Sequence, residues 1–157
     1  MAPTLTPPAR TIDPRGQRFG AGTSVVILVV AFVTGWFWLA ALVGVNLLGG
    51  TATADRIALD GGGELVAAGA GTGPVVAIVH PHSVTVHASA PTGSARNVWP
   101  GAVESIEPLG DRVRVRVAGT VPLTAEITPA ALTDLGIGPG TEVWTSVKAT
   151  DVTVDPA

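Results

Sequence analysis

The chain has 157 residues, no cysteine, a formal net charge of -3 and 46% hydrophobic residues. The lack of cysteine excludes a disulfide framework and a catalytic thiol, and the acidic balance excludes the broad positive field that binds nucleic acid. The length allows one small domain together with a separate, strongly apolar segment.

Residues 1–19 are rich in proline and threonine without helical or alternating periodicity, so we predict a disordered tail. Residues 20–50 follow as a predicted single transmembrane segment. No charge occurs between Arg18 and Asp55, and about 20 apolar residues suffice for one helical crossing. Three arginines before this segment favour a cytoplasmic N-terminus, which places the rest of the chain outside.

A cleaved signal peptide is the alternative interpretation of the apolar segment. Ala52-Thr53-Ala54 has the small-residue pattern of a cleavage site. The apolar run is longer than the hydrophobic region of most signal peptides, and this length favours a single-pass membrane anchor.

Residues 51–90 are predicted to form a small β subdomain. Short β-rich runs are separated by glycine and proline, and the dipeptide Asp60-Gly61 suits a hairpin turn. The runs cover residues 56–60, 64–68, 74–79 and 83–87.

Residues 91–157 are predicted to form a small barrel. Arg112 to Val117 alternates arginine with valine, which puts the valines on a core face. The Thr128–Gly136 stretch reads as one short helix with a threonine cap, a proline in its first turn and a terminal glycine. Strands are expected at Val98–Glu107, Arg112–Val117, Pro122–Ile127, Glu142–Lys148 and Asp151–Val154.

The predicted fold class is therefore mainly β. It comprises a small OB-like five-stranded barrel with one short helix, preceded by a small β subdomain and one transmembrane helix.

Two short cationic motifs point to an anion site. Lys148 is the only lysine, and small and hydroxyl-bearing residues flank it; the earlier motif is Ser94-Ala95-Arg96-Asn97. Guanidinium and ammonium groups beside residues that let backbone amides approach a ligand suit an oxyanion.

These motifs also carry a family resemblance. Ser94-Ala95-Arg96-Asn97, Leu123–Thr128, Pro139-Gly140 and Val147-Lys148-Ala149 follow in order the pattern of the Mop (TOBE-type) molybdate-binding domain, over Ser94–Val154. The preceding region is similar to the stretch before that domain in ATP-binding subunits of molybdate ABC importers. The resemblance implies that molybdate or tungstate binds where two barrels meet and that importer subunits are possible partners. A barrel of about 60 residues buries only a modest fraction of its surface, so we also expect a homo-oligomer.

The candidate oxyanion-binding residues combine positive charge with hydrogen-bond donors. We expect Arg96 to grip two anion oxygens and Lys148 to act as a point charge, with Asn97 supporting the loop. The complete set is Ser94, Ala95, Arg96, Asn97, Thr128, Lys148 and Ala149.

Competing interpretations exist for several motifs. Arg96 and Lys148 could be surface charges that pair with Glu104 or Glu126. The arginine stripe at residues 112–116 is interpreted as a solvated strand face, and no nucleic acid partner is expected.

The histidines His80, His82 and His87 could suggest a metal. Zinc usually needs a closed set of three or four ligands, but the chain has no cysteine and Pro81 interrupts the strand pairing of the first two histidines, so no metal is expected. The glycine-rich residues 69–73 lack the ending of a P-loop, and no catalytic grouping can be assembled. We therefore expect no cofactor and no enzyme activity.

The leading hypothesis is a membrane-tethered protein that binds molybdate or tungstate in transport, sensing or storage. The alternative is a non-catalytic regulatory or docking subunit of an ABC importer that no longer binds anions. A recombined gene remnant without a selected role is a third interpretation.

The charge rule places the barrel outside the membrane, whereas the family resemblance favours the cytoplasm. A reporter fused after Ala157 and read on both sides of the membrane decides between them. The charge rule predicts signal from the outer side, and signal only from the cytoplasm would contradict it.

Overall fold

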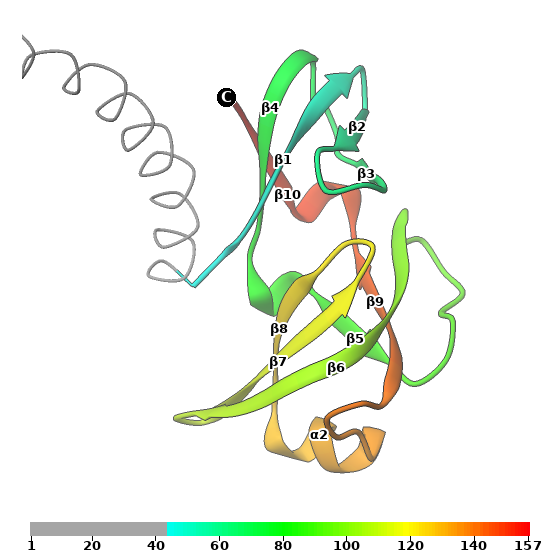
Figure 1. Cartoon of the computed structure of the whole chain (residues 1–157), viewed down its shortest axis with the longest axis vertical. Helices are drawn as coiled ribbons and strands as arrows, with labels where there is room; N and C mark the ends of the chain where they lie inside the picture. Colours follow the sequence, from blue (N-terminus) through cyan, green and yellow to red (C-terminus); the bar gives the residue numbers. More distant parts are fainter. Residues whose placement is uncertain (1–43) are drawn as a thin grey trace, which may run out of the picture. The chain divides into compact units, whose positions relative to one another are not determined.

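A computed structural model describes residues 44–157, which fold into two five-stranded sheets (Figure 1). Sheet A has the order β10-β4-β1-β2-β3, and sheet B has the order β5-β9-β6-β7-β8. The strands are β1 (Asn46–Thr53), β2 (Arg56–Leu59), β3 (Glu64–Val66), β4 (Thr72–Val79), β5 (Thr85–His87), β6 (Asn97–Leu109), β7 (Arg112–Gly119), β8 (Leu123–Ile127), β9 (Glu142–Val147) and β10 (Val152–Pro156). The helical elements are α2 (Pro129–Leu135) and the 3-10 turns η1 (Pro81–Ser83) and η2 (Ala149–Asp151).

The predicted tail and most of the predicted membrane segment lie outside the described residues. The end of that segment is part of a sheet, because residues 46–50 begin β1, which pairs with both β2 and β4. Leu48 packs against the core of the sheets. Within residues 44–157, no helix is long and apolar enough to cross a membrane.

The alternating pattern of β7 is confirmed. Val113, Val115 and Val117 are buried, with at most 6% of their surface exposed. On the other face, Arg112 and Arg114 bond to Glu126 on β8, while Arg116 lies near Glu104 on β6. The arginine stripe is therefore a strand face whose charges are matched by carboxylates.

The predicted helix is confirmed together with its caps. The Thr128 hydroxyl accepts a hydrogen bond from the Ala131 amide at 3.1 Å, and Pro129 begins the helix. Gly136 ends it in the left-handed conformation, with φ 61° and ψ 32°. This conformation costs a residue with a side chain about 1 kcal/mol or more, which explains glycine at this position.

Sheet B curls into a half-barrel around an irregularity in β6. The pairing of β6 with β7 shifts register between Val103 and Ser105. A β-bulge of this kind bends a strand and increases its twist. The loop before β9 is fixed at the same point, because Gly140 donates to the Val103 carbonyl at 2.7 Å.

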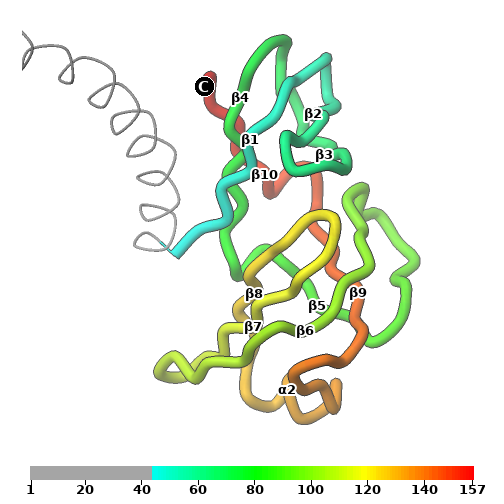
Figure 2. The backbone as a smooth tube through the Cα atoms, in the orientation of Figure 1, coloured from blue at the N-terminus to red at the C-terminus, as the bar shows by residue number. Residues whose placement is uncertain are grey.

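The two sheets exchange their last strands, which differs from the predicted division at residue 90. Strand β5 joins sheet B beside β9, and β10, expected in the barrel, joins sheet A beside β4. Figure 2 shows the chain passing from β9 through the short turn η2 into β10. The turn η1 takes the chain from β4 in sheet A to β5 in sheet B, and η2 takes it from β9 in sheet B to β10 in sheet A. Each sheet is therefore built from two separate stretches of the sequence.

This exchange relates the two halves of residues 44–157 by an approximate internal symmetry. Strands β1 to β5 have the same order and pairing as β6 to β10. The residue before η1, His80, has φ -71° and ψ 139°, and the residue before η2, Lys148, has φ -74° and ψ 142°. Buried residues of both sheets belong to one hydrophobic cluster, so the halves share a core.

Two buried asparagines bind the halves to each other. The Asn46 side chain on β1 donates to the Thr124 carbonyl at 2.9 Å and accepts from the Thr124 amide at 2.7 Å. In the matching position on β6, Asn97 bonds in the same way to the amide and carbonyl of Val66, at 2.6 and 2.8 Å. Each asparagine therefore satisfies the backbone of the opposite half.

We expect Asn46→Ala and Asn97→Ala each to lower the free energy of unfolding by about 1–3 kcal/mol, because each leaves partly buried backbone groups without a partner. Urea denaturation of the full-length protein measures this change. Thr51→Ala, at an exposed position of β1, is the control and should stay within about 0.5 kcal/mol of the wild type. Equal effects from all three variants would contradict the role of the asparagines.

Glu126 should make stability depend on pH. The hydrogen bond from Arg114, with a further one from Arg112, lowers the pKa of Glu126 below its ordinary value of 4.5. The ionised carboxylate therefore stabilises the fold above that value, and this stabilisation is lost as the pH falls through the lowered pKa. We expect Glu126→Gln to cost about 1–3 kcal/mol of unfolding free energy at neutral pH, and less in acid.

Thermal or urea unfolding of the wild type and of Glu126→Gln, from neutral to acid pH, measures the difference in their free energies of unfolding. The control is Glu104→Gln, since Glu104 is 57% exposed and lies 3.9 Å from Arg116. An exposed pair of this kind contributes little, so its variant should match the wild type. A Glu126→Gln effect that does not change with pH would contradict the role of ionisation.

Candidate functional site

The pairing of β6 with β9 brings the two cationic motifs together. Asn97 is the register partner of Val147 in this antiparallel pair. The next residue outward on each strand is Arg96 on one side and Lys148 on the other. The two cations thus lie at the same end of neighbouring strands, although about fifty residues separate them in the sequence.

The pleat of the sheet indicates that both side chains share one face. Asn97 and Val147 are buried, at 2% and 1% exposure. Successive residues of a strand point to opposite faces, so the next pair points away from the core. Arg96 and Lys148 lie just outside the two strands and are both exposed.

The turn η2 holds Lys148 and Ala149 against the other half of the protein. The Ala149 carbonyl accepts a hydrogen bond from the Ala68 amide at 3.2 Å. Inside the turn, the Asp151 amide donates to the Lys148 carbonyl at 3.0 Å. The backbone around Lys148 is therefore fixed on both sides, which limits the conformational entropy lost when a ligand binds.

The remaining predicted residues fall into two groups. Ser94 is exposed and Ala95 half-buried directly before Arg96, so both accompany the cation. Asn97 is occupied with the Val66 backbone and supports the loop. Thr128 lies away from the strand end that carries Arg96 and Lys148. It follows Ile127, which pairs with Val113 of β7. Val113 in turn pairs with Pro108, near the opposite end of β6. Its hydroxyl caps α2, which Figure 1 shows at that far end of sheet B.

Glu104 and Glu126, the carboxylates considered as surface partners of Arg96 and Lys148, interact with other arginines. Glu126 bonds to Arg112 and Arg114, and Glu104 lies near Arg116. No carboxylate among residues 44–157 lies within salt-bridge distance of Arg96 or Lys148. The two cations retain their charge for a ligand.

The three histidines lie in two separate places. His80 and His82 stack with ring centroids 5.3 Å apart, whereas His87 bonds to the Ser146 hydroxyl at 2.8 Å. Among the residues that the structure describes, no three metal-binding side chains come together.

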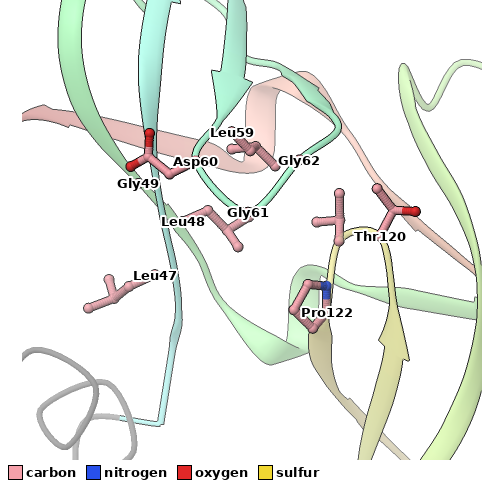
Figure 3. Close-up of a pocket in the computed structure, with 10 residues that line it drawn as sticks. Leu47, Leu48, Gly49, Leu59, Asp60, Gly61, Gly62, Thr120 and Pro122 are labelled. Atoms are coloured by element: carbon pink, nitrogen blue, oxygen red, sulfur yellow. The ribbon is translucent and has the colours of Figure 1, made fainter. Parts of the chain in front are cut away.

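A separate cavity lies between the start of β1, the turn after β2 and the turn after β7. Figure 3 shows Leu47, Leu48, Leu59 and Pro122 around it, with Asp60 at its edge. Its lining is mainly apolar and includes a carboxylate, so it does not suit an oxyanion.

Comparison with known proteins finds similar sequences and a similar fold. A family model described as the TOBE domain matches residues 93–154. The chain is 38% identical over 86 residues to a molybdenum import ATP-binding protein ModC of Mycobacterium tuberculosis, a match that covers 52% of this chain. It is 39% identical over 79 residues, 50% of this chain, to a molybdate/tungstate import ATP-binding protein WtpC of Pyrococcus horikoshii. Each match spans 23% of the relative's length.

A solved structure extends the likeness beyond the TOBE match. The cytoplasmic molybdate-binding protein ModG, crystallised with molybdate bound, superposes with a TM-score of 0.64 at 27% identity. The alignment covers 71% of this chain and 96% of ModG. Residues 93–154 thus match the TOBE domain model, within a two-sheet fold similar to that of ModG.

Proposed function

We propose that this chain binds a tetrahedral oxyanion, molybdate or tungstate, at the end of β6 and β9. The observation that carries the proposal is the pairing of Asn97 with Val147, because Arg96 and Lys148 are their next residues along the chain. Ser94, Ala95 and Ala149 complete the site with a hydroxyl and backbone amides.

Charge and hydrogen bonding favour a dianion without protons. The guanidinium of Arg96 offers a planar fork of donors, and the Lys148 ammonium adds a compact charge. Phosphate is partly protonated at neutral pH, and among the proposed groups only the Ser94 hydroxyl could accept a hydrogen bond from its O–H. Sulfate differs from molybdate mainly in size, so its exclusion depends on the width of the site.

The named relatives support this choice of ligand. ModG is a molybdate-binding protein, and the ModC and WtpC proteins belong to importers of molybdenum, molybdate or tungstate. We propose that this chain is a binding protein without catalytic activity, connected with molybdate transport, sensing or storage. Importer subunits are proposed partners on the same basis.

Anion binding at this site requires neither self-association nor membrane attachment. Arg96 and Lys148 adjoin a register pair of one chain, so the proposed site does not need self-association to bring these two residues to one strand end. We retain a homo-oligomer as part of the proposal, because an anion on the surface gains more contacts when a second copy covers it. Membrane attachment through residues 20–50 remains a prediction from the sequence.

Isothermal titration of the full-length protein with sodium molybdate tests the site. Arg96→Ala and Lys148→Ala should each weaken binding by about 10- to 100-fold, since each removes a hydrogen bond to a charged group. Arg116→Ala is the control, because it removes an equal charge from an exposed position of β7 and should leave the affinity unchanged.

Because Lys148 is the only lysine, acylation at this residue offers a second measurement. Bound molybdate should slow it. A flat titration of the wild-type protein would reject the proposal, and co-purification of an importer ATPase without anion binding would favour the docking subunit instead.

A further inference from the structure

The turn between β1 and β2 combines an unusual backbone conformation with contacts to a distant part of the chain. Thr53 pairs with Arg56, so Ala54 and Asp55 form a two-residue hairpin turn. Ala54 has a φ of 56°, and among residues 44–157 it is the only residue other than glycine with a positive φ. This left-handed conformation is unfavourable for a residue with a side chain, so other contacts must hold the turn in place.

The turn between β6 and β7 is the matching turn of the other half. Leu109 pairs with Arg112 around Gly110 and Asp111, and Gly110 has nearly the same φ, 61°. Glycine adopts this conformation without strain. Figure 1 shows this longer hairpin projecting from sheet B, and the Asp111 side chain at its tip is 94% exposed. The same kind of turn thus reaches into solvent in one half and contacts the protein in the other.

Asp55 holds residues 66–69, the segment that ends β3 and follows it, through both its backbone and its side chain. The Asp55 carbonyl accepts a hydrogen bond from the Ala67 amide at 2.9 Å, and its Oδ1 accepts from the Gly69 amide at 3.1 Å. The residue between them, Ala68, donates its amide to the Ala149 carbonyl of η2 at 3.2 Å. Asp55 therefore fixes the residues on both sides of the one that contacts η2.

The same segment supports the backbone beside both cations of the proposed anion site. Ala149, its partner in η2, directly follows Lys148 in the chain. Asn97 directly follows Arg96 and bonds to the amide and carbonyl of Val66, the first residue of the segment, at 2.6 and 2.8 Å. Both attachments of the anion site to the first half therefore come from one short stretch.

We propose that Asp55 is a positioning residue for the anion site, and that the strained turn at Ala54 is kept because it places this carboxyl group against residues 66–69. This role rests on the proposed function. Asp55 does not bind the anion itself but acts through Ala68 and η2. A site whose backbone is held before the ligand arrives loses less conformational entropy on binding.

Variants of the two matching aspartates test this role in the full-length protein. Asp55→Ala removes the side-chain acceptor of Gly69 and should weaken molybdate binding about 3- to 10-fold, whereas Asp111→Ala should change it less than about twofold. Asp55→Asn keeps an oxygen acceptor and removes a negative charge, so it should bind at least as tightly as the wild type. Titration calorimetry measures the affinities, at a temperature where thermal unfolding shows each variant to be folded.

A second pair of variants tests the turn without changing any charge. Ala54→Gly removes the strain and should keep the wild-type affinity. Ala54→Val should weaken binding as Asp55→Ala does, because a β-branched residue resists a positive φ and the turn must then rearrange.

Hydrogen–deuterium exchange reports the positioning without any ligand. In Asp55→Ala, the amides of Ala68 and Asp151 should exchange faster than in the wild type, because the segment that holds η2 is loosened. In Asp111→Ala, these amides should exchange at the wild-type rate.

The outcomes separate the two proposals. If the wild type binds molybdate and a folded Asp55→Ala binds as tightly, the role of Asp55 is wrong and the proposed function stands. An equal loss of affinity in Asp55→Asn and Asp55→Ala would also contradict that role, because the acceptor is retained in one of them. If the wild type does not bind molybdate, the proposed function fails, and the exchange rates alone decide whether Asp55 holds η2. Should Asp55→Ala fail to fold, the comparison of Ala54→Val with Ala54→Gly decides.

Discussion

The antiparallel pairing of β6 with β9 is the constraint on which the account of this protein depends. It sets Asn97 opposite Val147, and the pleat then fixes what lies one residue further out. Arg96 and Lys148 follow directly, so two positive charges lie at the same end of neighbouring strands. A bound dianion would lower the repulsion between them.

Support and binding are divided between neighbouring residues of the same strands. Asn97 and Val147 face inward, where the asparagine secures the backbone of the first half and the valine fills the core. Arg96 and Lys148 face outward. The exchange of β5 and β10 makes each half complete the sheet of the other, so neither half has an independent binding surface. An anion held beside η2 would therefore fasten the two halves together and raise the stability of the whole fold.

Local patterns predicted the elements well because they act within a few residues. Alternation identified β7, and the caps Thr128 and Gly136 identified α2. The two cationic motifs were also recognised from their residue types. Thr128 was included for its hydroxyl, which is used by its own helix and lies at the opposite end of the sheet.

The pairing of strands could not be predicted in the same way. A β pattern indicates where a strand runs but not which sheet it joins, so the exchange of β5 and β10 was missed. Strand β1 was hidden because Leu47 and Leu48 continue an apolar run, and hydropathy does not distinguish a lipid environment from a protein core. A signal for the internal symmetry was present in Val84-Thr85-Val86 and Val152-Thr153-Val154, which follow η1 and η2.

The most direct test of the central claim is a crystal structure of the protein grown with tungstate, whose anomalous scattering locates the anion without ambiguity. The account predicts an anomalous peak at the end of β6 and β9, with oxygens within about 3 Å of the Lys148 ammonium and the Arg96 guanidinium. Tungstate bound beside His80 or in the cavity at Asp60, with the Arg96 and Lys148 end empty, would contradict it.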